Sequence, residues 1–159
     1  MRAVGRDITK PSMLAIQSIG ATLAAASFDD PESLSVAFKD AYAIFGNTTF
    51  AATRSVEAET AQGTNIVDSA AKVSSLKHFI WSGAADTKGM SQNKYDGIVH
   101  MQAKAHVQHY MAQRWPSLAA KTTTVVVQSY FENWTNLPGL FGPLKASLYN
   151  LLKVKEYYS

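Results

Sequence analysis

Short apolar runs alternate with helix-like segments along this chain, and no other feature constrains its fold as strongly. The apolar runs predict strands over residues 2–6, 21–28, 41–46, 76–81 and 122–127. Apolar side chains at helical spacing predict helices over residues 11–19, 31–39, 56–73 and 98–114. Strands that are separated by helices favour a parallel sheet. The sequence therefore predicts an α/β fold in which helices flank a parallel sheet.

Residues at the predicted helix ends support these boundaries. Gly20 is suited to the C-terminal cap of the first helix, and Pro31 and Glu32 suit the first turn of the second. We interpret Asp29 and Asp30 as helix-capping residues rather than as ligands. A polar loop is expected over residues 83–97, and a turn-rich linker with an amphipathic helix is expected over residues 135–159.

Length and composition restrict the class of protein. A chain of 159 residues, 47% of them hydrophobic, can bury one substantial core and is too short for two ordinary domains. The sequence contains no cysteine, so a disulfide framework, a thiolate zinc site and a cysteine nucleophile are excluded. Residues 1–10 lack the pattern of a signal peptide, and we expect a cytoplasmic protein.

Charge and hydropathy argue against several kinds of partner. The net charge is +3, but the basic residues are scattered, so nucleic-acid binding is not expected. The longest apolar runs are far shorter than the roughly 20 residues that span a bilayer, so no membrane segment is expected. His106 and His109 have no third ligand at a matching position, and we predict no metal site.

Polar and aromatic residues close several of the predicted strands. In open parallel sheets, ligands bind outside the carboxyl ends of the strands, so these residues are the functional candidates by topology alone. They are Arg6, Ser27, Asn47, Thr48, Thr49, Phe50, Ser82, Tyr130, Phe131, Asn133 and Trp134.

The strings around these positions carry a family resemblance. They are VGRD, SFDDPESL, AYAIFGNTTF, QGTNIVDSA, KHFIWSG, HMQAK and YFENW, in that order. Together they resemble the NmrA-like group of atypical short-chain dehydrogenases, particularly its fungal members. The resemblance implies that residues 1–134 form an incomplete Rossmann-like NAD(P)-binding domain and that residues 135–159 remain from a substrate region. The family includes oxidoreductases and redox-sensing regulators.

One part of the family pattern is missing. The opening strand and its glycine-rich phosphate loop would precede Arg2, and in the family's 3-2-1-4-5-6 order that strand is central. We therefore expect unpaired backbone groups on its two neighbours, at about 1–3 kcal/mol for each buried group, and the loss of the main anion-binding element. A misplaced start codon and a true truncation both explain the gap, and we favour the first.

The resemblance also implies roles for the strand-end residues. Arg6 would pair with a 2′-phosphate, which favours NADP over NAD, unless it is a solvated arginine beside Asp7. Ser27 stands where the family usually has an acid or amide near the adenine. The run Asn47, Thr48, Thr49 and Phe50 would line the nicotinamide side, with a plain polar turn as the alternative.

His100 and Lys104 lie four residues apart in a predicted helix and so share one face. In short-chain dehydrogenases a Tyr-x-x-x-Lys pair has this spacing, so the resemblance implies that Lys104 binds the nicotinamide ribose. His100 stands in the tyrosine's place as a candidate proton donor, with Ser82 as the third member. A chance pair on an exposed helix face is the alternative. Tyr130 and Asn133 would contact substrate or nicotinamide.

Three functional hypotheses follow. The first is an NADP-dependent oxidoreductase that moves hydride between nicotinamide and a small carbonyl, imine or enone substrate. The second is a non-catalytic NAD(P)-sensing regulator that binds a protein partner. The third is an inactive fragment, which the absent phosphate loop favours.

Overall fold

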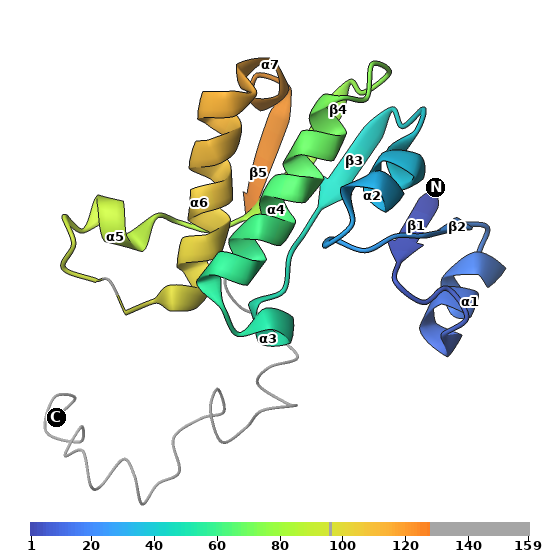
Figure 1. Cartoon of the computed structure of the whole chain (residues 1–159), viewed down its shortest axis with the longest axis horizontal. Helices are drawn as coiled ribbons and strands as arrows, with labels where there is room; N and C mark the ends of the chain where they lie inside the picture. The colour runs from blue at the N-terminus through green and yellow to red at the C-terminus, as the bar shows by residue number, and fades with distance from the viewer. Residues whose placement is uncertain (96, 128–159) are drawn as a thin grey trace, which may run out of the picture. The chain divides into compact units, whose positions relative to one another are not determined.

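The computed structural model describes residues 1–95 and 97–127 and shows the predicted alternation of strands and helices (Figure 1). In chain order the elements are β1 (Arg2–Gly5), α1 (Pro11–Ser18), β2 (Thr22–Ala25), α2 (Pro31–Phe38), β3 (Ala43–Gly46), α3 (Phe50–Thr53), α4 (Val56–Ala71), β4 (His78–Gly83), α5 (Thr87–Met90), α6 (Val99–Arg114), α7 (Pro116–Ala119) and β5 (Thr122–Val126). The sequence predicted neither α3 nor α7, and the segment expected as a plain loop over residues 83–97 contains α5. The region predicted as a linker and helix, 135–159, lies outside the described residues.

All strand pairs among the described residues are parallel, as predicted, but they form two sheets. In one sheet β1 pairs with β2, from Arg2 opposite Thr22 to Gly5 opposite Ala25. The other has the order β3-β4-β5. Within the described part of the chain, β1 and β3 each have a single paired edge, and a hollow of about 820 Å³ is lined by residues of both strands. The sheets are thus separated between β1 and β3, the two strands on which unpaired backbone groups were expected.

The helix α2 connects the two sheets. It packs against both β2 and α4, and its Leu34 is fully buried. The guanidinium of Arg2, at the start of β1, donates to the carbonyl oxygens of Ala37 (2.7 Å) and Lys39 (3.0 Å) at the C-terminal end of this helix. Because these carbonyls at the helix C-terminus lack intrahelical partners, a cation there is favourable.

The main core lies between the β3-β4-β5 sheet and helices α4 and α6, which run side by side (Figure 1). Phe79 and Trp81 of β4 are fully buried, and their rings stack with centroids 6.3 Å apart. Helix α4 contributes Ile66, Val67 and Ala70 to this core, and all three are buried. Each large side chain buried in this way contributes about 1.5–3 kcal/mol. By contrast, α1 has no fully buried residue.

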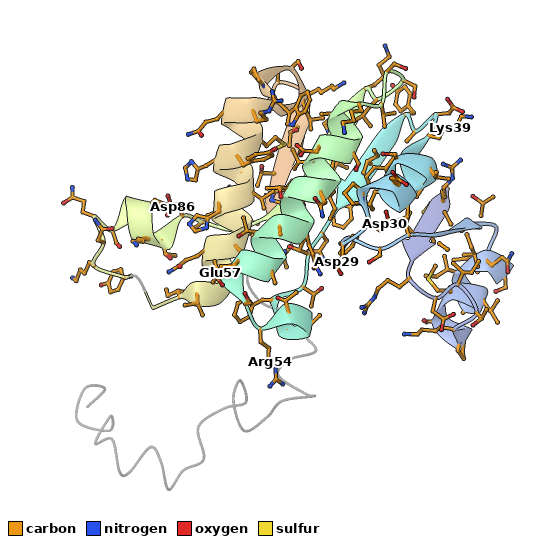
Figure 2. All side chains as sticks on the ribbon, in the orientation of Figure 1. Asp29, Asp30, Lys39, Arg54, Glu57 and Asp86 are labelled. Carbon is orange, nitrogen blue, oxygen red and sulfur yellow. The ribbon has the colours of Figure 1, made fainter. Side chains whose placement is uncertain are left out.

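The N-terminus of α2 corrects one interpretation (Figure 2). The Asp30 carboxylate accepts hydrogen bonds from the backbone N–H groups of Glu32 and Ser33, so it caps the helix as predicted. Asp29 does not cap it. Its Oδ1 instead accepts a hydrogen bond from Nε2 of Gln62 on α4, at 3.0 Å. This side chain therefore joins two helices that are distant in sequence.

Gly63 lies on α4 where the helix packs closely against Val107 of α6. A Cβ at this position would overlap the side chain of Val107, which is fully buried on α6. A glycine inside a helix costs about 1 kcal/mol relative to alanine, and the close approach explains why it is present.

We expect Gly63→Ala to lower the free energy of unfolding by about 1–2 kcal/mol, because overpacking outweighs the gain in helix propensity. Val107→Ala should relieve the overlap. The double variant should therefore be more stable than the sum of the two single effects predicts, as measured by urea denaturation. Additive effects would show that the two helices do not touch here.

Candidate functional site

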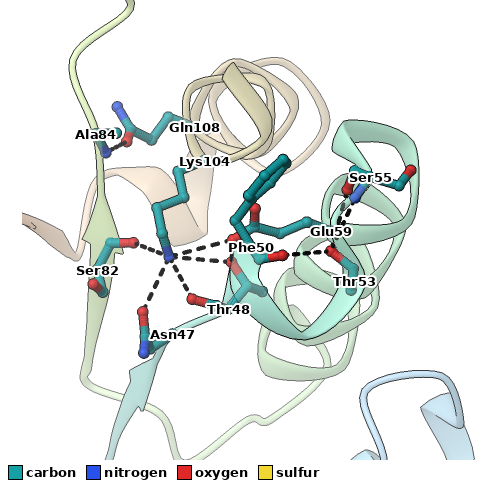
Figure 3. Close-up of polar contacts among 10 residues, drawn as sticks. All are labelled: Asn47, Thr48, Phe50, Thr53, Ser55, Glu59, Ser82, Ala84, Lys104 and Gln108. Atoms are coloured by element: carbon teal, nitrogen blue, oxygen red, sulfur yellow. Dashed lines mark hydrogen bonds and ion pairs between the residues drawn. The ribbon is translucent and has the colours of Figure 1, made fainter. Parts of the chain in front are cut away.

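Four elements bring polar side chains together at the carboxyl ends of β3 and β4. We term this group the Lys104 cluster; it consists of Asn47, Thr48, Glu59, Ser82 and Lys104 (Figure 3). Asn47 and Thr48 follow β3, Ser82 belongs to β4, Glu59 to the first turn of α4, and Lys104 to α6. Three of the strand-end candidates, Asn47, Thr48 and Ser82, thus lie within hydrogen-bond distance of Lys104.

The ammonium of Lys104 links the ends of the two strands. Its Nζ donates to the Thr48 carbonyl oxygen (2.7 Å), to Asn47 Oδ1 (3.0 Å) and to Thr48 Oγ1 (3.2 Å), and the Ser82 carbonyl oxygen lies at 3.4 Å. It also lies 5.8 Å from the ring centroid of Trp81. An ammonium has three N–H donors, so the cluster provides an acceptor for each of them.

Glu59 is the functional candidate that the sequence analysis missed. Its side chain is 0% exposed, its Oε1 accepts a hydrogen bond from Thr48 Oγ1 at 2.7 Å, and Lys104 Nζ lies 3.6 Å away. The signal that could have found it is its spacing. Glu59 lies four residues before Gly63 and seven before Ile66, on the buried face of α4, where a carboxylate needs a partner.

Burial and charge act in opposite directions on Lys104. Removal of its ammonium from water lowers the pKa of Lys104, and the nearby carboxylate of Glu59 offsets part of this effect. The net pKa lies below the ordinary lysine value. Desolvation disfavours the charged form of a lysine, so a nearby anion helps to keep it protonated.

A hydrogen bond holds α6, and with it Lys104, against the end of β4. Gln108 lies one turn after Lys104, and its Oε1 accepts a hydrogen bond from the backbone N–H of Ala84 at 2.9 Å (Figure 3). Gly83 allows this approach, because a Cβ there would overlap Gln108 Oε1 and the Thr124 side chain. The lysine is therefore presented from a fixed helix.

A second group of predicted residues lines a pocket of about 280 Å³ between the ends of β1, β2 and the loop after β3. We term it the Arg6 pocket; its polar lining consists of Arg6, Ser27, Asp29, Thr49, Thr53 and Gln62. Arg6 is exposed, which agrees with the alternative of a solvated arginine, and Asp7 Oδ1 accepts from the backbone N–H and the hydroxyl of Thr9. Ser27 Oγ accepts a hydrogen bond from the Asp29 backbone N–H at 3.3 Å.

The run from Asn47 to Phe50 was expected to line the nicotinamide side, but its residues lie in different places. Asn47 and Thr48 belong to the Lys104 cluster, whereas Thr49 lines the Arg6 pocket. Phe50 begins α3, where its carbonyl oxygen accepts from the backbone N–H of Arg54 at 2.7 Å. Consecutive residues of this run therefore lie at different parts of the edge.

The proposed catalytic group is only partly described. Ser82 approaches Lys104 through its backbone carbonyl oxygen, which the sequence analysis did not anticipate. His100 lies in α6, one turn before Lys104 as predicted, but its side chain is outside the described part of the structure. Tyr130 and Asn133, with Phe131 and Trp134, also lie outside the described residues.

His109, one of the two histidines considered as metal ligands, lies next to a carboxylate. His109 Nε2 lies 3.1 Å from Asp86 Oδ2. Hydrogen bonds from the Gly89 backbone N–H and from His109 lower the pKa of Asp86. Residues 1–95 and 97–127 contain no group of three or more side chains that could hold a metal ion. In the same residues, no helix combines the length and apolar character that crossing a membrane requires.

Known structures share this fold. NmrA, a negative transcriptional regulator, superimposes with a TM-score of 0.68 at 22% identity, over 83% of this chain and 38% of NmrA, and it has also been solved in complex with NADP. Triphenylmethane reductase from Citrobacter sp., complexed with NADP(H), gives 0.61 at 19% identity, over 85% of this chain and 42% of the reductase. AtPrR2 with NADP+ and (+)pinoresinol gives 0.64 at 17% identity, over 91% of this chain and 48% of AtPrR2.

The chain thus spans less than half the length of each of these three proteins. A search of curated proteins found no match. The NmrA-like family model matches residues 1–147, which is most of the sequence. This chain belongs to the NmrA-like family.

Proposed function

We propose that this chain binds NADP along the carboxyl ends of its strands and acts as the dinucleotide-binding part of an oxidoreductase. The observation that carries the proposal is the Lys104 ammonium, which α6 delivers to the point where β3 and β4 end. Open parallel sheets bind their ligands at this edge. NmrA, the triphenylmethane reductase and AtPrR2 have been solved with NADP, NADP(H) and NADP+, respectively, which supports the choice of cofactor.

The described residues fit a dinucleotide at this edge. The Arg6 pocket offers a guanidinium to a 2′-phosphate and the hydroxyls of Ser27 and Thr49 to the adenosine half. The Lys104 cluster offers an ammonium and the Asn47 amide to the nicotinamide ribose. When bound, the nicotinamide would donate or accept the hydride.

The chain's own residues would orient the cofactor and move a proton. Lys104 would hold the ribose hydroxyls in exchange for its longest protein contact, the Ser82 carbonyl oxygen at 3.4 Å, while its contacts with Asn47 and Thr48 keep the ammonium in place. His100, one turn earlier on α6, is the proposed proton donor, and Ser82, at the end of β4, is the proposed third member of the group. The proposed substrate is a small carbonyl, imine or enone, each of which accepts a hydride at carbon. The proton then goes to oxygen in a carbonyl, to nitrogen in an imine and to carbon in an enone.

A second candidate function is a non-catalytic NADP-sensing regulator that binds a protein partner. The observation that favours it is the residue at position 100. A histidine stands four residues before Lys104, where the short-chain dehydrogenase pattern has a tyrosine, and the Ser82 contact with Lys104 uses a carbonyl oxygen rather than the hydroxyl. Binding without turnover would identify this function.

The Arg6 pocket leads to a prediction on cofactor choice. Arg6→Ala should weaken NADPH binding about ten-fold, the effect of losing about 1.4 kcal/mol, because a charge-assisted contact with the 2′-phosphate is removed. NADH binding should change little. Titration calorimetry with both cofactors measures this difference, and Lys10→Ala provides a nearby exposed control. Equal weakening of NADPH and NADH would exclude a role for Arg6 in 2′-phosphate recognition.

A turnover assay separates the two candidate functions. NADPH oxidation against a panel of quinones and carbonyls should be detectable with the wild-type chain and should fall about 100-fold or more in Lys104→Met, because misplaced reactants lose this much rate. Lys72→Met is the control and should keep wild-type activity; Lys72 is the residue that directly follows α4. NADPH binding with no turnover on any member of the panel would favour the regulator.

A further inference from the structure

Glu59 is the only charged side chain buried in the core among the residues that the structure describes. Its Oε1 receives the Thr48 hydroxyl and faces Lys104, while its Oε2 is buried with no hydrogen-bond partner in the described residues. A buried carboxylate is costly unless a cation and hydrogen bonds compensate for the lost water. The structure provides one cation for this purpose, the ammonium of Lys104.

The Thr48 side chain joins the two charges in a directed way. A hydroxyl has one proton and two lone pairs, and Thr48 gives its proton to Glu59 Oε1. A lone pair then remains to accept from Lys104 Nζ at 3.2 Å. These two hydrogen bonds can run only from the ammonium to the hydroxyl and from the hydroxyl to the carboxylate. The position of the carboxylate therefore fixes where the ammonium lies.

We propose that Glu59 is a positioning residue that keeps Lys104 protonated and directs its ammonium, through Thr48, to the ends of β3 and β4. The role rests on the proposed function, because it matters for cofactor binding only if Lys104 contacts the dinucleotide. Glu59 itself acts through Lys104. Its carboxylate is fully buried behind the lysine and Thr48, so it is not placed to touch a ligand.

Few other titratable groups can replace Glu59 in this role. β3 and β4 face Lys104 with Asn47, Thr48, Trp81 and Ser82, which carry no charge. The remaining charged groups of α4, α5 and α6 in the described residues have other contacts or lie on the surface. Glu57 accepts from Ser55, Asp68 accepts from Tyr110 and Trp115, and Asp86 pairs with His109, while His106 and Lys88 are exposed.

Direct titration of Lys104 tests the proposal without any cofactor. A lysine loses its charge as the pH rises through its pKa, and removal of a nearby anion moves this loss to lower pH. In the full chain labelled with ¹³C at lysine Cε, the Lys104 signal is identified by its absence in Lys104→Met. Glu59→Gln should lower the midpoint of its titration by about one pH unit or more.

Glu57→Gln is the matched control, because it removes an acid from the same turn of α4 that is exposed and bonded to Ser55. Its Lys104 midpoint should equal that of the wild type. The second variant is Thr48→Val, which removes the hydroxyl that accepts from the Lys104 ammonium and should also lower the Lys104 midpoint. This variant keeps the proposal testable if Glu59→Gln does not fold.

NADPH titration at a series of pH values then connects the pair to the proposed function. In Glu59→Gln, affinity should begin to fall at lower pH than in the wild type or in Glu57→Gln. An unchanged Lys104 midpoint in Glu59→Gln, or in Thr48→Val, would overturn the positioning role. Shifted midpoints in a chain that binds no NADPH would support the Glu59–Lys104 pair and reject the proposed function instead.

Discussion

The candidate site depends on keeping one ammonium charged where little water reaches it. Lys104 is only 16% exposed along its side chain, and its Nζ joins β3, β4 and α4 through oxygen atoms of Asn47, Thr48, Ser82 and Glu59. Such a charge is costly to bury alone and favourable when acceptors and an anion surround it. The close packing of α6 on α4 and β4 therefore determines the chemistry available at this edge.

The two parts of the site belong to two different sheets. The Arg6 pocket draws on β1 and β2, whereas the Lys104 cluster draws on β3 and β4, and the loop after β3 contributes to both. Because α2 packs on both β2 and α4, it maintains the relation between these parts. The hollow between β1 and β3 lies at the same break, bordered by strand edges that the described residues leave unpaired.

Local patterns in the sequence predicted most of the fold and part of the site. Apolar runs and helical spacing located the strands and long helices, and Asp30 followed by Pro31 marked a helix start correctly. Positions such as Ser27, Asn47 and Lys104 were found because they follow strands or match a family pattern. Glu59 and the Asp29–Gln62 contact were missed, because they depend on which helices pack together, which sequence spacing alone does not reveal.

A crystal structure of the chain with NADP+ tests the central claim most directly. Lys104 Nζ should lie within hydrogen-bond distance of the nicotinamide ribose hydroxyls, and the Arg6 guanidinium should contact the 2′-phosphate. The dinucleotide would then run from the Arg6 pocket to the Lys104 cluster. A cofactor bound elsewhere, for instance in the hollow between β1 and β3, with Lys104 contacting only protein oxygens, would contradict the account.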